Sequence, residues 1–202
     1  MNQTLIFWDV DTQVDFMLPE GKLYVPGAET IIPTLTRLTQ WAAQHGVLVA
    51  ASADAHQPGD EEFSQYPPHC LAGTPGQKKI PQTSLTPQFT IPNRAGAGLP
   101  ELERYRQVII EKQDIDIFTN PTTEAFLAQL SKPEIVLYGV VTEICVAAAG
   151  RGLLDRGYRV TIIQDGIWDL EAEKAKAFLE EVRWRGGQIV AAEQLLCARA
   201  AA

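Results

Sequence analysis

Short apolar segments rich in β-branched residues alternate along the chain with segments whose apolar residues recur at helical spacing. Continuous apolar runs of this length are typical of strands that are buried on both faces of a sheet. The runs that predict strands lie at residues 5–10, 47–51, 108–110, 135–141, 160–163 and 189–190.

Three of the intervening segments predict amphipathic helices. In residues 30–45, Leu35 and Leu38 belong to one apolar helical face, and residues 122–130 and 171–184 show a similar periodicity. Alternating strands and helices predict a three-layer α/β/α fold, with helices on both faces of a mostly parallel, Rossmann-like sheet of about six strands. In such folds the binding sites lie beyond the carboxyl ends of the strands.

Residues 57–98 interrupt this alternation. They contain seven prolines and five glycines, so no regular helix can run through most of the segment. Loops of this length in a compact domain are usually functional or disordered. His69 and the aromatic residues within the segment, and His56 directly before it, favour a function. We therefore interpret residues 1–202 as one domain with a functional loop insertion at about 54–98.

Composition and charge narrow the class of protein. With 46% hydrophobic and 21% charged residues, the chain has the profile of a globular domain with a full core. The net charge of -8 and the scattered basic residues argue against a nucleic-acid partner and favour a small-molecule substrate. No apolar run approaches the ~20 residues that span a bilayer, and the N-terminus lacks a signal-peptide pattern, so we expect a cytoplasmic protein without a membrane partner.

The 3 cysteines match no disulfide or zinc-finger spacing, and Cys145 has the most informative position of them. It follows a predicted strand at the start of a predicted helix. The free backbone N–H groups there would favour a thiolate and would also stabilise an oxyanion. This placement predicts the nucleophile of an acyl-transfer reaction.

Two further polar residues follow other predicted strands, Asp11 after the first and Lys112 after the third. A carboxylate near a thiol can take its proton, and a lysine beside both keeps the carboxylate ionised. Each residue alone has a structural explanation, as a turn cap, a solvated lysine or a buried thiol. Because the carboxyl ends of parallel strands meet at one edge of a sheet, Asp11, Lys112 and Cys145 together predict a catalytic triad.

Asp54, His56 and His69 form a second group. One carboxylate and two imidazoles are the ligand set of an open Zn²⁺ site or a similar divalent site. Without Asp54, the two histidines would be interpreted as surface-loop residues. Asp60 and Glu62 lie between them in the sequence and are available as a further ligand or as an acceptor behind a ligand.

These residues occur in recognisable motifs. Residues 11–16, Asp-Thr-Gln-Val-Asp-Phe, resemble the opening of the isochorismatase-like cysteine hydrolases, and residues 139–146 resemble their nucleophile segment. Residues 54–56 and 66–76 are similar to the metal-binding part of the nicotinamidases within that family. The resemblance runs in order through most of the chain.

The resemblance implies a role for each matching residue. Asp11 would be the general base, Lys112 its charge partner and Cys145 the nucleophile. A cis peptide bond before Val141 would direct the backbone N–H groups of Val141 and Cys145 to the oxyanion. The implied metal ligands are Asp54, His56 and His69, with Glu62 as a further ligand in some members; the ion would be zinc, with Fe²⁺ or Mn²⁺ as alternatives.

The implied reaction is hydrolysis of a small carboxamide through a thioester, with nicotinamide to nicotinate as the leading hypothesis. Phe16, Tyr66 and Gln13 would line the substrate pocket, although Tyr66 replaces a common Trp and residues 113–120 depart from the nicotinamidase pattern. The alternatives are an isochorismatase-type or other small-amide hydrolase and a non-catalytic interaction module. By the same resemblance we expect a homo-oligomer.

Overall fold

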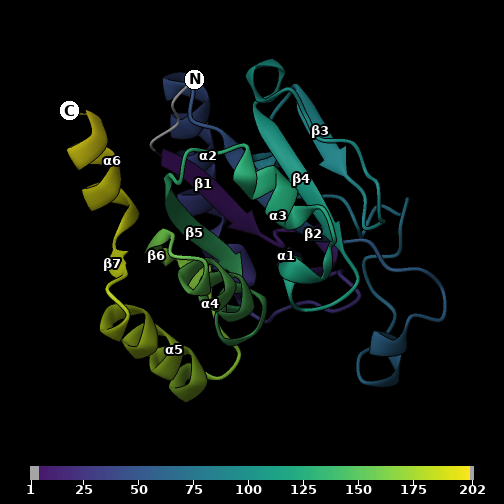
Figure 1. The fold of residues 1–202 in the computed structure, drawn as a ribbon. Coiled ribbons are helices and arrows are strands. Elements are labelled where there is room, and N and C mark those ends of the chain that lie inside the picture. The colour runs from purple at the N-terminus through teal and green to yellow at the C-terminus, as the bar shows by residue number, and fades with distance from the viewer. Residues whose placement is uncertain (1–4, 201–202) are drawn as a thin grey trace.

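The computed structural model describes residues 5–200. Its centre is a parallel sheet of seven strands in the order β3-β4-β2-β1-β5-β6-β7 (Figure 1). The strands are β1 (Leu5–Val10), β2 (Val49–Asp54), β3 (Gln88–Ile91), β4 (Gln107–Lys112), β5 (Glu134–Val140), β6 (Arg159–Trp168) and β7 (Gln188–Val190). The predicted parallel sheet is confirmed, with seven strands in place of about six.

Helices cover both faces of the sheet. They are α1 (Val14–Met17), α2 (Ile32–His45), α3 (Thr123–Ala128), α4 (Ala147–Asp155), α5 (Ala172–Trp184) and α6 (Ala192–Ala200). One apolar cluster joins α3, α4 and α5 to Trp8 of β1, and a second joins α2 and α6 to Phe7. Consecutive strand residues point to opposite faces, so one strand serves both layers. The predicted three-layer fold is confirmed, and none of the helices within residues 5–200 has the length and apolar character needed to cross a membrane.

The strand that the sequence did not predict is β3. It pairs with β4 at the edge of the sheet, where Gln88 and Thr90 are exposed. It lies between Pro87 and Pro92, and an edge strand tolerates such neighbours because one of its sides makes no ladder hydrogen bonds. Since half of its side chains face solvent, β3 lacks the apolar run by which the other strands were recognised.

The order of the strands determines where the site lies. From β1 the chain proceeds to β2 on one side, and it later places β5 on the other side. The sheet therefore has a topological switch point between β1 and β5, where loops diverge and leave a crevice at the carboxyl ends of the strands. Asp11 directly follows β1 and Cys145 follows β5, so both belong to this crevice.

Candidate active site

The structure brings Asp11, Lys112 and Cys145 together. The Nζ atom of Lys112 lies 3.0 Å from Oδ2 of Asp11 and 3.8 Å from the sulfur of Cys145. The negative charge of Asp11 also raises the pKa of the Cys145 thiol, so the carboxylate acts on the sulfur as a near neighbour. Asp11 and Lys112 are almost fully buried, whereas Cys145 is half-buried. The structure thus gathers a thiol, a carboxylate and an ammonium group in one cluster.

Ser52, which the sequence analysis missed, holds the other oxygen of Asp11. Its hydroxyl donates to Oδ1 of Asp11 over 2.7 Å. The signal was present, because Ser52 precedes Asp54 by two residues in β2 and the two side chains therefore share one face of the strand. Asp11 itself has a φ of 50°, a left-handed conformation in which Asp is among the better tolerated residues.

Burial and charge determine the protonation of the triad. Burial alone would lower the pKa of Lys112, but the carboxylates of Asp11 and Asp54 raise it well above its ordinary value, so Lys112 is an ammonium. Burial raises the pKa of the Cys145 thiol well above its ordinary value, and Lys112 only partly opposes this. Burial therefore opposes the thiolate predicted from the helix N–H groups. The thiol needs a base, and Asp11 is its near neighbour.

The backbone around Cys145 also differs from the expectation. The Val140–Val141 peptide bond is cis, as the resemblance implies. A single π-helical turn, Thr142–Val146, then precedes α4, so Cys145 lies in this turn and not at the start of the α-helix. The Val146 N–H donates to the Val141 carbonyl over 3.1 Å. Turns of this kind occur often at functional sites.

The predicted metal ligands lie side by side. One ligand atom from each of Asp54, His56 and His69 falls within 4.8 Å of the others, and all three residues are buried. Oδ2 of Asp54 is 3.7 Å from Nε2 of His56 and 3.6 Å from Nε2 of His69. Both Nε2 atoms are buried without a hydrogen-bond partner among the described residues. Two unpaired imidazole nitrogens facing a carboxylate fit a divalent metal ion.

Glu62 belongs to the same group. Its carboxylate oxygens lie 3.8 Å from Nε2 of His69 and 3.9 Å from Nε2 of His56. Burial raises the pKa of Glu62, and the nearby charge of Asp54 adds to this effect. A cation between these groups would oppose that repulsion, so Glu62 is available as a further ligand, as the resemblance implies.

Asp54 connects the two groups. Its Oδ1 accepts a hydrogen bond from Lys112, while Oδ2 faces the two histidines. Burial alone would raise the pKa of Asp54, but Lys112 lowers it strongly, so the carboxylate is ionised. The triad and the metal-ligand cluster therefore form one continuous site.

Gln13 has a different role from the predicted one. It is fully buried and does not line the pocket, because its amide oxygen accepts from the Asp54 N–H over 2.7 Å and its amide nitrogen donates to the carbonyls of Asp54 and Gln77. Asp15 acts similarly, since its carboxylate accepts from the N–H of Cys70, the residue after His69. Gln13 and Asp15 of the motif at 11–16 thus help to position the predicted metal ligands.

A cavity of about 90 Å³ opens beside Cys145. Phe16 and Tyr66 line it as predicted, together with Val141. The sequence analysis missed the remaining apolar and aromatic wall, which consists of Leu23, Tyr24, Val25, Ile115, Ile144 and Leu170. These residues come from four separate segments, and only Ile144 lies within one of the recognised motifs. A cavity of this size and lining fits a small, mainly apolar or aromatic group.

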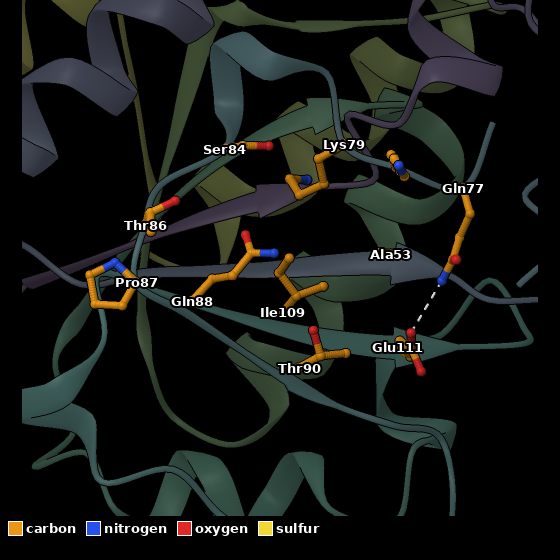
Figure 2. Close-up of a pocket in the computed structure, with 11 residues that line it drawn as sticks. Ala53, Gln77, Lys79, Ser84, Thr86, Pro87, Gln88, Thr90, Ile109 and Glu111 are labelled. Atoms are coloured by element: carbon orange, nitrogen blue, oxygen red, sulfur yellow. Dashed lines mark hydrogen bonds between the residues drawn. The ribbon is translucent and has the colours of Figure 1, made fainter. Parts of the chain in front are cut away.

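A larger cavity, of about 740 Å³, lies on the opposite face of β2 and β4 (Figure 2). Ala53 and Glu111 line it, each directly before a residue of the active site, and Gln77 donates a hydrogen bond to Glu111 over 3.1 Å. Its described lining contains no cysteine and no histidine. A choice between the two cavities by volume alone would therefore have missed Cys145 and the metal-ligand cluster.

Comparison with known proteins agrees with this geometry. Residues 4–194 match the isochorismatase domain. The chain belongs to the isochorismatase family. The Escherichia coli (strain K12) protein named nicotinamidase is 28% identical over 190 residues, which cover 85% of this chain and 87% of that protein. The family resemblance seen in the sequence is thus confirmed.

Solved structures of the isochorismatase family show the same fold. An isochorismatase-like hydrolase from Alkaliphilus metalliredigens superposes with a TM-score of 0.78 at 24% identity, covering 96% of this chain and 98% of that chain. The pyrazinamidase of Pyrococcus horikoshii, solved in complex with zinc, has a TM-score of 0.72 at 26% identity and covers 93% and 99% of the two chains. With the metal-ligand cluster, these relatives support an amidohydrolase of this family.

Proposed function

We propose that this protein is a metal-containing cysteine amidohydrolase that converts a small carboxamide into the acid and ammonia, with nicotinamide as the first substrate to test. The observation that carries the proposal is the cluster of Asp11, Lys112 and Cys145 at the wall of a small apolar cavity. A nucleophile, a base near it and a fixed positive charge are the groups that acyl transfer requires.

The first half of the reaction forms a thioester. As the sulfur of Cys145 bonds to the amide carbon, Asp11 accepts the thiol proton. The positive charge of Lys112 stabilises the negative charge on Asp11 before the transfer and on the sulfur during it. The backbone N–H groups of Val141 and Cys145 are the proposed donors to the oxyanion. When the tetrahedral intermediate collapses, the C–N bond breaks and Asp11 returns the proton to nitrogen, which leaves as ammonia.

The second half hydrolyses the thioester. Asp11 removes a proton from water as the water oxygen bonds to the acyl carbon. The C–S bond then breaks, and the proton on Asp11 returns to the sulfur of Cys145. One water is consumed for each amide cleaved, and the acid leaves with the thiol regenerated.

Asp54, His56, His69 and Glu62 are the residues that would hold the metal ion, with zinc as the leading candidate and Fe²⁺ or Mn²⁺ as alternatives. When bound, such an ion supplies a Lewis-acidic position for a lone pair of the substrate. Asp54 and His69 line the same cavity as Cys145, so the ring nitrogen of nicotinamide, which is meta to the carboxamide, would face this cluster.

The aromatic wall supports an aromatic amide. Phe16 and Tyr66 line the cavity and offer ring surfaces to a flat substrate. The names of the relatives, nicotinamidase and pyrazinamidase, also refer to aromatic amides. Cleavage of a vinyl ether, the isochorismatase reaction, would leave Cys145 and the metal-ligand cluster without a use, so amide cleavage is the stronger proposal.

An ammonia-release assay tests the proposal. Zinc-loaded protein is given nicotinamide, pyrazinamide and small aliphatic amides, and we expect release from at least one aromatic amide. The Cys145→Ala variant should release none while keeping the thermal unfolding transition of the wild type. Substantial amidase activity in that variant, or hydrolysis of a vinyl ether in the absence of any amide hydrolysis, would overturn the proposal.

A further inference from the structure

Hydrogen bonds from three residues in two segments of the chain converge on the carboxylate of Asp60, which lies in the loop after β2. Its Oδ2 atom accepts from the Gln57 N–H over 2.9 Å, and it lies 3.1 Å from Nδ1 of His56 and 3.2 Å from Nε2 of Gln113. Behind Gln113, the amide nitrogen of Asn93 donates to Oε1 of Gln113 over 3.1 Å. The chain of contacts thus runs from Asn93 through Gln113 and Asp60 to His56.

The chemistry of these groups fixes their orientations. An ionised carboxylate only accepts hydrogen bonds, so Gln113 must present its NH₂ group to Asp60, which leaves its oxygen for Asn93. For the same reason, Nδ1 of His56 carries a proton toward Asp60. The lone pair of the neutral ring is then on Nε2, the buried atom that faces Asp54 and His69.

We propose that Asp60 is a positioning residue that sets the ring orientation and the tautomer of His56 for metal binding, and that Gln113 and Asn93 hold Asp60 in place. The inference rests on the proposed function and deepens it. It also explains Gln113, which belongs to the segment where this chain departs from the nicotinamidase pattern. Gln113 directly follows β4 and supports the metal-binding loop through its hydrogen bond to Asp60.

His69 provides the contrast. Its Nδ1 atom lies 2.8 Å from the backbone carbonyl of Pro67, so its orientation depends on the main chain of its own loop. The orientation of His56 depends instead on the side chain of Asp60. Asp60 in turn is held by Gln113, which lies more than fifty positions further along the chain. A substitution at Asp60 should therefore affect one metal ligand and leave the other in place.

Zinc affinity, measured in the full-length protein by competition with a chromogenic chelator, tests this role. We expect Asp60→Ala to weaken zinc binding ~10- to 100-fold, as the loss of a carboxylate behind a ligating histidine does in other proteins. Asp60→Asn keeps an acceptor oxygen and should lose much less. Gln113→Ala removes one donor to Asp60 and should weaken binding ~2- to 10-fold.

Glu61→Ala is the matched control, because it removes an exposed carboxylate from the same loop and should leave zinc affinity unchanged. In the zinc-loaded wild type, the Nδ1 proton of His56 should give a slowly exchanging ¹H–¹⁵N NMR signal that Asp60→Ala abolishes. Equal zinc affinity in wild type and Asp60→Ala would overturn this inference and leave the proposed function intact. A wild type that binds none of Zn²⁺, Fe²⁺ and Mn²⁺ would overturn both.

Discussion

The two cavities against the sheet differ about eightfold in volume, about 90 Å³ beside Cys145 and about 740 Å³ on the opposite face of β2 and β4 (Figure 2). Both are built on the same strand ends. The side chains of Asp54 and Lys112 lie on the face of the sheet that carries the smaller cavity. Their neighbours in the sequence, Ala53 and Glu111, line the larger cavity on the other face. The difference shows that the alternation of side chains along a strand, and not the available volume, determines where chemistry is possible.

The sharpest test of this difference replaces the nucleophile. Cys145→Ala should lower kcat at least ~1,000-fold, because removal of a nucleophile from a triad disables the whole unit. Ser84→Ala, at the wall of the larger cavity, should leave kcat unchanged. Ammonia release gives the rates, and circular dichroism checks the fold. A comparable loss from both variants would show that the larger cavity takes part in the reaction.

The two buried lysines give the next comparison. Lys112 contacts Asp11 and Asp54, and Lys79, beside the larger cavity, lies 3.0 Å from Asp9. Replacing either by Met leaves a buried carboxylate without its cation and should lower the free energy of unfolding by about 3–5 kcal/mol. Urea unfolding measures this loss. Only the Lys112 variant should also lose amidase activity at temperatures where both variants are folded.

Metal binding at the smaller cavity should stabilise the whole fold, because the ion binds the native state in preference to the unfolded chain. Zinc at 100 times its dissociation constant should raise the free energy of unfolding by about 2.7 kcal/mol, and a chelator should remove this gain. Differential scanning calorimetry measures the shift. His56→Ala should abolish most of the zinc effect, and an equal zinc effect in that variant would place the ion elsewhere.

Burial in the smaller cavity should also control the reactivity of Cys145. Since burial raises the pKa of its thiol, alkylation of the metal-free protein by iodoacetamide at pH 8 should be at least ~10-fold slower at Cys145 than at the exposed Cys197. Below its pKa the thiolate fraction of a thiol rises tenfold per pH unit, so the Cys145 rate should still climb at a pH where an unperturbed model thiol has levelled off. Mass spectrometry resolves the two sites. Faster alkylation at Cys145 than at Cys197 would show that Cys145 is a thiolate in the resting protein.

The smallest effect is expected at the wall of the larger cavity. Glu111→Ala removes the acceptor of the Gln77 side chain and should cost about 0.5–1.5 kcal/mol of stability. Amidase activity should stay at the wild-type level, because Glu111 points away from the site. A large fall in kcat without loss of fold would show that Gln77 transmits changes to Gln13 and Asp54.

Most of the fold followed from local patterns. Buried strands such as β1 and β5 are mostly apolar, so their positions are visible in the sequence. The half-exposed edge strand β3 lies between prolines, and its position is not visible. The π-helical turn at Cys145 was also missed, because it has no residue pattern of its own and arises where β5 passes into α4.

The residues that carry reactive groups were predictable from the sequence by itself, because Asp11, Lys112 and Cys145 follow recognisable strands and parallel strands place their ends at one edge. Only the tertiary structure decided the partners and the protonation of these groups. The contacts that Ser52, Gln13 and Asp60 make depend on which distant segments meet, and the protonated thiol of Cys145 depends on how deeply it is buried. Both depend on long-range packing, which local periodicity does not encode.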